Sequence, residues 1–496
     1  MDNLFRKEIL KNLATTVTTN GAKALSSALN AVVSLFGMIG ALRWQSEDEI
    51  INRFEDAWAE DQLLTLKMVF HTRNIRGGMG ERRTARILFR HLAMTRPEVM
   101  KKNMVYIPSF GRWDDLYCLV DTPCESEMFK LMKTQFDADL YAVQKSQETG
   151  EHIEVSLLGK WLPSCNTSSE ETRRLAKKTM KHFGMREREY RKALSTLRSY
   201  LKVVETDISA GRWDSVKYAG VSSKAMSTYR NAFHRHDAEG FTKYLESLKK
   251  GEKKINAATL FPYEIFREYG VFDAYRDCNS YDEVLEQQWK ALPNYVDDTN
   301  VIVMADTSGS MECYNALPLQ TSLSLAVYFA ERTKGAFKNL YMTFDRKPRF
   351  VSLEGTTLKE KIDNIRNIDV ANTNIEAAMR LILDTAIKGN VPAEDMPKAL
   401  VIISDMQFDR ASRDNYYQDV FEEMFSEAGY TVPNIVYWNV NATNPVFHAV
   451  SDVKGVQMAS GSSPALFKSI LSNLGKTPAE AVMEVLNDTK YDMITL

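Results

Sequence analysis

Residues 301–311, VIVMADTSGSM, constrain the fold of this chain more than any other segment. The apolar run predicts a buried parallel strand, which ends in the pattern Asp-x-Ser-x-Ser. The Asp306 carboxylate and the Ser308 and Ser310 hydroxyls therefore follow the strand, where open α/β sheets bind ligands. Such oxygen ligands favour Mg²⁺ or Mn²⁺ over zinc. The simpler alternative is a serine-rich turn in which Asp306 caps the next helix.

Two further segments favour the metal site. Residues 399–405, ALVIISD, predict a second buried strand that ends in Asp405. Between the two strands, Thr373 lies in an Asn-Thr-Asn segment just before residues 375–383, which have helical spacing and an asparagine cap. The sequence therefore predicts an additional hydroxyl and a second carboxylate near Asp306.

These oxygen ligands resemble the metal-ion-dependent adhesion site of von Willebrand factor A domains, in which the same residue types occur in the same order. They are Asp306, Ser308, Ser310, Thr373 and Asp405. The resemblance implies an open position on the metal that a carboxylate from a protein partner can fill. The residue chemistry alone implies only a site for a hard cation.

The C-terminal part, residues 296–496, predicts a doubly wound α/β domain, because strands and helices alternate along it. A mostly parallel sheet covered on both faces is expected. Further strands are predicted at 339–344, 349–353, 434–440 and 455–459, and helices at 319–333, 375–387, 413–428 and 465–474.

Residues 1–295 predict an all-helical domain of helical pairs stacked as an irregular solenoid. Apolar positions recur with helical spacing in residues 54–70, 85–94, 126–141, 192–204 and 241–248. A Gly-Arg-Trp-Asp motif occurs at Gly111 and again at Gly211. The motif indicates either a shared turn with its Trp in the core or a pair of arginines that face a ligand.

Charge is distributed unevenly over the 496 residues. The net charge of −2 combines −8 for residues 296–496 with +6 for residues 1–295, which suggests that the first half meets a polyanion. The five cysteines have no CxxC spacing, as expected of reduced thiols in a cytosolic protein. The apolar run 31–42 is too short to span a bilayer, so no membrane partner and a cytoplasmic location are expected.

Basic residues cluster in the first half, where they form either solvated helix faces or contacts to phosphates. Arg76 and Arg82 lie in a glycine-containing segment, and Arg112 belongs to the first Gly-Arg-Trp-Asp motif. The densest cluster comprises Arg173, Arg174, Lys177, Lys178, Lys181, Arg186, Arg188, Arg191 and Lys192. Possible stacking partners for unpaired bases are Trp161, His182, Phe183, Tyr190 and Tyr200.

Four segments of the first half resemble the TROVE module of Ro autoantigen proteins and their relatives in microbes and viruses. They are residues 73–82 (RNIRGGMGER), 107–116 (IPSFGRWDDL), 157–164 (LLGKWLPS) and 221–226 (VSSKAM). This module followed by an A domain accounts for nearly the whole chain.

The resemblance implies a ring of HEAT-like helical repeats, closed by the A domain, that binds RNA without cutting it. Small structured RNA is expected on the basic outer face and single-stranded ends in the central hole. We expect the cluster at residues 173–192 to contact RNA, with Arg76, Arg82 and Arg112 near the rim. A ring closed on itself favours a monomer.

Enzyme motifs are incomplete. Asp306-Thr307-Ser308 lacks the second Asp of a haloacid-dehalogenase phosphatase, and Ile470 replaces the first Gly of a phosphate loop before Gly475. We therefore expect no catalysis. The alternative to RNA binding is a protein-interaction scaffold, in which the metal site captures a partner carboxylate and RNA has no role.

Overall fold

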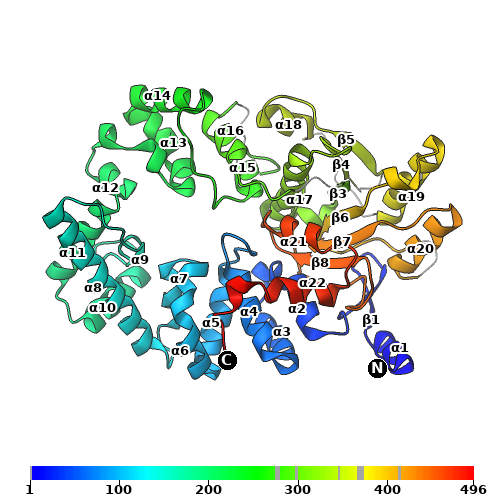
Figure 1. The fold of residues 1–496 in the computed structure, drawn as a ribbon, viewed down its shortest axis with the longest axis horizontal. Helices are drawn as coiled ribbons and strands as arrows, with labels where there is room; N and C mark the ends of the chain where they lie inside the picture. Colours follow the sequence, from blue (N-terminus) through cyan, green and yellow to red (C-terminus); the bar gives the residue numbers. More distant parts are fainter. Residues whose placement is uncertain (1–2, 274–279, 297–299, 344–346, 366–373, 412–414) are drawn as a thin grey trace.

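Helices form most of the first half of the chain, and a mainly parallel sheet forms the centre of the second half (Figure 1). The computed structural model describes residues 3–273, 280–296, 300–343, 347–365, 374–411 and 415–496. The predicted combination of a helical half with an α/β half is therefore confirmed.

The helices of the first half follow a curved path that leaves the sheet and returns to it (Figure 1). Near the end of this path, helix α15 contacts α17 of the second half, so the helical path returns to the α/β half. The longer helices are α3 (Glu47–Glu60), α4 (Gln62–Arg73), α5 (Arg83–Thr95), α6 (Pro97–Asn103), α8 (Glu125–Thr149), α10 (Glu170–Phe183), α11 (Glu187–Tyr200), α13 (Ser223–His236), α14 (Ala238–Lys249), α15 (Pro262–Glu268) and α16 (Glu283–Lys290). Shorter ones are α7 (Ile107–Phe110), η3 (Trp113–Leu119), α9 (Leu158–Trp161) and α12 (Val204–Ser209).

Two predicted helices of the first half are each divided by a break. Within 54–70, Asp61 adopts an extended conformation, ends α3 and caps α4 by accepting a 2.9 Å hydrogen bond from the Leu64 amide. Within 192–204, α11 ends at Tyr200 and Lys202 adopts a left-handed conformation (φ 52°). Apolar spacing continued across both breaks, so periodicity alone did not reveal them.

The first half is not entirely helical, which corrects the sequence prediction. After helix α1 (Leu4–Leu13), strands β1 (Thr15–Val17) and β2 (Lys23–Leu25) form an antiparallel hairpin. The Leu25 amide donates to the Phe447 carbonyl of the second half (2.8 Å). Three-residue strands are too short for an alternating pattern to identify them.

Six strands form a single sheet among the described residues, in the order β5-β4-β3-β6-β7-β8. All neighbours are parallel except β4 and β5, which form the predicted hairpin. The strands are β3 (Val301–Ala305), β4 (Leu340–Thr343), β5 (Arg349–Ser352), β6 (Ala399–Ser404), β7 (Asn434–Asn439) and β8 (Val456–Ser460). The accompanying helices are α17 (Cys313–Arg332), α18 (Leu358–Ile365), α19 (Ile375–Gly389), α20 (Tyr417–Glu427), α21 (Leu466–Ser472) and α22 (Pro478–Leu486).

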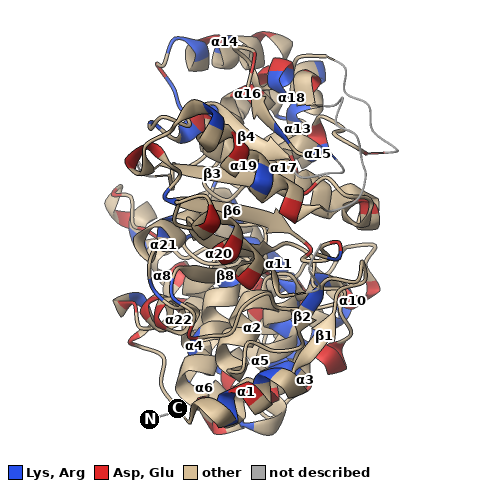
Figure 2. Cartoon of the chain, turned by 90° about the vertical axis from the view of Figure 1, so that its right-hand side faces the viewer, with Lys and Arg blue, Asp and Glu red and all other residues tan. Residues whose placement is uncertain are grey.

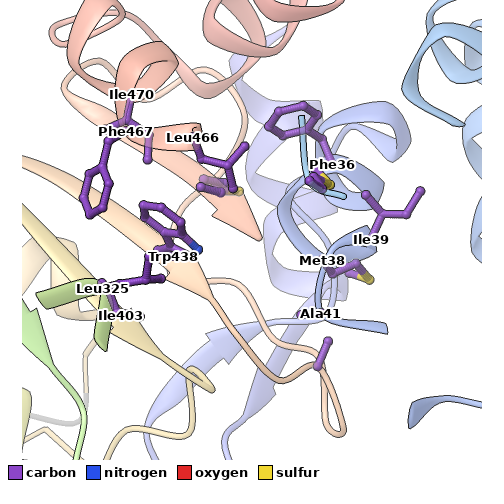
Figure 3. Close-up of a cluster of buried hydrophobic side chains, with 14 of the residues drawn as sticks. Phe36, Met38, Ile39, Ala41, Leu325, Ile403, Trp438, Leu466, Phe467 and Ile470 are labelled. Atoms are coloured by element: carbon purple, nitrogen blue, oxygen red, sulfur yellow. The ribbon is translucent and has the colours of Figure 1, made fainter. Parts of the chain in front are cut away.

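Helices cover both faces of this sheet, as the alternation of elements predicted. Trp438 on β7 points towards α21, where its ring lies 4.8 Å from that of Phe467 (Figure 3). Tyr437 points to the opposite face, because successive side chains of a strand alternate, and helix α2 (Ala31–Ile39) packs there against β8. A helix from the start of the chain thus covers part of the sheet formed by its end.

Helix α2 and strand β8 approach each other at a glycine. The Gly40 amide donates to the Ser460 hydroxyl (3.0 Å), and this hydroxyl donates to the Phe36 carbonyl (2.8 Å). A Cβ atom on Gly40 would lie 2.3 Å from the Ser460 carbonyl oxygen. This contact between α2 and β8 therefore requires glycine at position 40 for close approach, although the φ of Gly40, −70°, suits any residue.

The C-terminal segment binds back to the helical half. Tyr491 is buried, stacks on Phe110 at 5.4 Å and shares a 2.7 Å hydrogen bond with Nδ1 of His71. The Thr495 amide donates to the Asn103 side chain (3.0 Å). Within the described ranges, no helix is both long and apolar enough to cross a membrane.

Gly40→Ala is predicted to destabilise the protein by at least about 2 kcal/mol, because the new methyl group meets backbone atoms that cannot rotate away. Gly220→Ala is the matched control, since a Cβ there meets no atom within 4 Å. Chemical denaturation of both variants measures the difference. Equal stabilities of the Gly40→Ala and Gly220→Ala variants would contradict the role assigned to the contact between α2 and β8.

Candidate functional site

The two predicted acidic ligands meet at the point where the strand order of the sheet reverses. Asp306 follows β3 and Asp405 follows β6, and these strands are parallel neighbours whose chain connections run to opposite sides. The Asp306 amide donates to the Ile403 carbonyl (3.0 Å), so the hydrogen bonding between β3 and β6 continues as far as Asp306. Open α/β sheets bind their ligands at this position.

Hydroxyl groups surround the two carboxylates. The Ser308 and Ser310 hydroxyl oxygens lie 3.1 Å apart, and the Ser308 amide donates to Asp306 Oδ1 (2.8 Å). The Ser310 side chain hydrogen-bonds to Asp405. The structure thus brings together four of the five predicted ligands, while Thr373 lies outside the described residues.

The electrostatics of the site favour a bound cation. Asp306 and Asp405 are both buried, and burial together with the charge of Asp405 raises the pKa of Asp306 to about 7. Burial also raises the pKa of Asp405. In the described part of the chain, no Lys or Arg is among the groups that shift either pKa. Two buried like charges without a counterion are costly, and a divalent cation would neutralise them.

Among the described residues, no group of three or more His, Cys, Asp and Glu side chains is arranged to hold a metal. The site at Asp306 has two carboxylates, so its remaining protein ligands would be hydroxyls. This donor set fits Mg²⁺ or Mn²⁺, which accept carboxylate, hydroxyl and water oxygens.

Several residues of the site were not predicted from the sequence. The Ser404 hydroxyl donates to Asp306 Oδ2 (2.5 Å), and the Asn441 side-chain amide donates to Cys313 Sγ (3.3 Å). Burial and the charge of Asp405 raise the pKa of Cys313 to about 11, so its thiol is neutral. In the sequence, the one indication that Ser404 belongs to the site is its position at the end of a strand, directly before Asp405.

The loop after Ser310 has an unusual backbone. Three consecutive residues, Tyr314, Asn315 and Ala316, adopt left-handed conformations with φ between 54° and 57°. Tyr314 stacks on Trp44 of the helical half at 4.5 Å. Strain of this kind is tolerated where neighbouring contacts hold the loop in place.

Added Mg²⁺ or Mn²⁺ is predicted to raise the free energy of unfolding, by about 2.7 kcal/mol when the free metal is 100-fold above its Kd. Asp306→Asn should abolish this stabilisation without destabilising the metal-free protein, because the substitution removes one of two like charges. Thermal unfolding with metal and with chelator measures both effects. Asp384→Asn, at an exposed position on α19, is the control. An undiminished metal effect in Asp306→Asn would contradict the assignment.

The densest predicted RNA-binding cluster lies on α10 and α11, where about half of its cations are paired. Arg174 and Lys178 bind Asp121, and Arg186 binds Glu189. Arg191 lies 3.8 Å from Glu187, and Arg173 donates to backbone carbonyls. The exposed members that form neither an ion pair nor a side-chain hydrogen bond within the described ranges are Lys177, Lys181, Arg188 and Lys192.

Two of the five predicted stacking partners are inaccessible to bases. Phe183 and Tyr190 are buried in the core. His182 stacks on Phe129 at 4.3 Å, and Tyr200 stacks on His152 at 5.4 Å. Helical spacing explains the error, because Phe183 and Tyr190 lie on the apolar faces of their helices.

The remaining predicted cations, Arg76, Arg82 and Arg112, lie near the first Gly-Arg-Trp-Asp motif. Arg82 binds Asp114, and Arg76 donates to the Ser109 carbonyl (2.9 Å). Arg112 lies over the Trp161 ring, 4.5 Å from its centre. Trp113 packs against the core, as the shared-turn interpretation predicts, and Arg112 is partly exposed. That the arginines face a ligand stays a prediction.

Comparison with known proteins identifies related families for both halves. The family described as Domain of unknown function (DUF2828) matches residues 18–134 and 166–300, together just over half of the chain. The chain belongs to the DUF2828 family. A second description, Domain of unknown function (DUF7788), matches residues 300–493, which contain the sheet and the candidate metal site.

A viral protein resembles this DUF2828 member along most of its length. An uncharacterized protein of Acanthamoeba polyphaga mimivirus is 28% identical over an alignment of 508 positions, which spans 95% of this chain and 86% of the viral protein. The similarity therefore includes both the helical half and the sheet.

Proposed function

We propose that this DUF2828 protein is a non-catalytic RNA-binding protein of the Ro type. In this proposal the helical half is a HEAT-like module, the second half is a von Willebrand factor A domain, and the two form a ring. The observation that carries the proposal is a set of four exposed cations on α10 and α11, Lys177, Lys181, Arg188 and Lys192, that have no partner among the described residues. They lie on the part of the helical path far from the sheet (Figure 1).

The placement of these cations suits a polyanion. Lys177 and Lys181 are four residues apart and share one face of α10, and Arg188 and Lys192 share one face of α11 in the same way. Glu187, Arg188, Arg191 and Lys192 line an open hollow beside α11. Cations without protein partners keep their full charge for phosphates, which makes binding dependent on salt.

The acidic half of the chain would repel the same polyanion. Helix α20 carries four acidic residues and neither Lys nor Arg, and its acidic residues are visible in the view towards the sheet (Figure 2). RNA is therefore expected on the helical half, and the candidate site at Asp306 is expected to bind Mg²⁺ or Mn²⁺ rather than RNA.

Replacing Lys177 and Lys181 with Gln is predicted to weaken binding of a single-stranded RNA. The slope of log affinity against log salt should fall by about 0.7 for each phosphate that the protein no longer neutralises. Fluorescence anisotropy across a salt series measures both quantities. Lys334→Gln with Lys338→Gln, at exposed positions in the second half, is the control of equal charge. Equal slopes for the two double variants would reject α10 as an RNA-binding surface.

A second candidate function is a protein-interaction scaffold. The exposure of the loop after β3, which carries Ser308 and Ser310, favours it. Gly309 and Ser310 are exposed, whereas the Asp306 and Asp405 side chains beneath them are buried. A cation held by these residues would face solvent on one side, where a carboxylate from a partner protein could complete its coordination.

The two candidate functions predict opposite outcomes for two variants. If the protein is a scaffold, Asp306→Ala abolishes metal-dependent binding of a carboxylate, and the Lys177/Lys181 variant leaves this binding unchanged. If it is an RNA-binding protein, Asp306→Ala leaves RNA affinity within about twofold of wild type. Acetate titration of the Mn²⁺-loaded protein, followed by water relaxation, measures the first outcome, and RNA anisotropy measures the second.

A further inference from the structure

Four arginines converge on two aspartates at the first Gly-Arg-Trp-Asp motif. Asp115 Oδ2 accepts from Arg73 Nε (2.7 Å), and Asp115 Oδ1 accepts from Arg86 Nε (2.7 Å). Asp114 Oδ2 accepts from Arg86 (2.9 Å) and from Arg82. These residues and Arg112 form what we call the arginine cluster.

The arginine cluster carries more positive than negative charge. The carboxylates that bear on Arg82 and Arg112 are Asp114 and Asp115, so four guanidinium groups face two carboxylates among the described residues. The closest acid outside the cluster in sequence, Glu81, is occupied by Arg43 (2.6 Å). No other carboxylate within the described ranges forms an ion pair with these four arginines, so the cluster itself has an excess of two positive charges.

Arg112 has unused hydrogen-bonding capacity. Its guanidinium makes no hydrogen bond to any described residue, and its nearest carboxylate oxygen, Asp114 Oδ1, is 3.6 Å away. The guanidinium carbon of Arg112 lies over the Trp161 ring, 4.5 Å from its centre, a contact that uses none of its N–H donors. Arg82 is also partly exposed, with 45% of its side chain accessible.

Burial is the main cause that lowers the pKa of Arg82 and Arg112, and repulsion from neighbouring arginines adds to it. Burial and the neighbouring Arg86 and Arg112 lower the pKa of Arg82, and burial lowers the pKa of Arg112 although Asp114 opposes it. A bound anion would remove this repulsion. By contrast, Arg73 is fully buried with Asp115 and serves the fold.

The second copy of the motif shows that the turn alone does not require this cluster. Arg212 forms a single ion pair with Asp207 (2.7 Å), and Trp213 stacks on His236 at 4.3 Å. Asp214 is exposed there and forms no ion pair within the described ranges. The arginines of the first copy thus exceed what the turn needs.

We propose that the arginine cluster binds the terminal phosphate of a single-stranded RNA, with Arg112 and Arg82 as its direct ligands. A terminal phosphomonoester carries nearly two negative charges at neutral pH and three acceptor oxygens, which match the excess charge and the free donors. An internal phosphodiester carries one charge and matches less well. This inference rests on the proposed RNA-binding function.

The test compares affinities of the full chain for one single-stranded RNA sequence prepared with a 5′-phosphate, with a 3′-phosphate, or with hydroxyls at both ends. We expect one phosphorylated strand to bind about tenfold more tightly than the hydroxyl strand, since one additional charge-assisted contact has about this effect. The end that is preferred gives the polarity of the bound strand. Equal affinities for all three strands would overturn the proposal.

Single substitutions test whether the arginine cluster is the origin of the preference for a phosphorylated strand. Arg112→Gln removes a guanidinium that makes no hydrogen bond within the described ranges, and Arg212→Gln is the matched change in the second motif. We expect Arg112→Gln to abolish the difference in affinity between the phosphorylated strand and the hydroxyl strand, and Arg212→Gln to keep this difference. Arg82→Gln is a second variant with the same expected result.

The outcomes separate this proposal from the proposed function. If the wild-type protein binds none of the three strands, RNA binding itself fails. If it binds all three equally and with a dependence on salt, RNA binding stands and the terminal-phosphate site is rejected. A preference that persists in both Arg112→Gln and Arg82→Gln would also reject the arginine cluster as its origin.

Discussion

The close contact between helix α2 and strand β8 holds together parts of the chain that are more than 400 residues apart in sequence. Ser460 links Gly40 to Phe36 across this contact, and no side chain larger than hydrogen fits at Gly40. With α15 packed on α17 at the other end of the helical path, the sheet joins both ends of the first half. The curved arrangement in Figure 1 depends on these two junctions.

Much of the second half could be predicted from local sequence. The strand runs before Asp306 and Asp405 are apolar except for Ser404, because both strands are buried, and the candidate ligands follow where the parallel strands end. Both aspartates therefore appear at the expected edge of the sheet. Ser404, Asn441 and Cys313 were missed because their roles depend on the packing of separate segments.

The first half was less predictable, because its critical interactions join distant residues. The break at Asp61 lies within continuous apolar spacing, and the role of α2 depends on a strand near the other end of the chain. The basic clusters illustrate the same limit. The sequence predicted both Arg82 and Arg174 as RNA contacts. In the structure, Arg174 pairs with Asp121 and Glu171, whereas Arg82 belongs to a group with excess positive charge.

Binding of single-stranded RNA is the central claim, and one measurement on the wild-type protein tests it most directly. Nuclease-treated protein is titrated with a short single-stranded RNA and with the matched duplex at several salt concentrations. The account predicts tighter binding of the single strand and an affinity that falls steeply as salt increases. Failure to bind either RNA at low salt would contradict it.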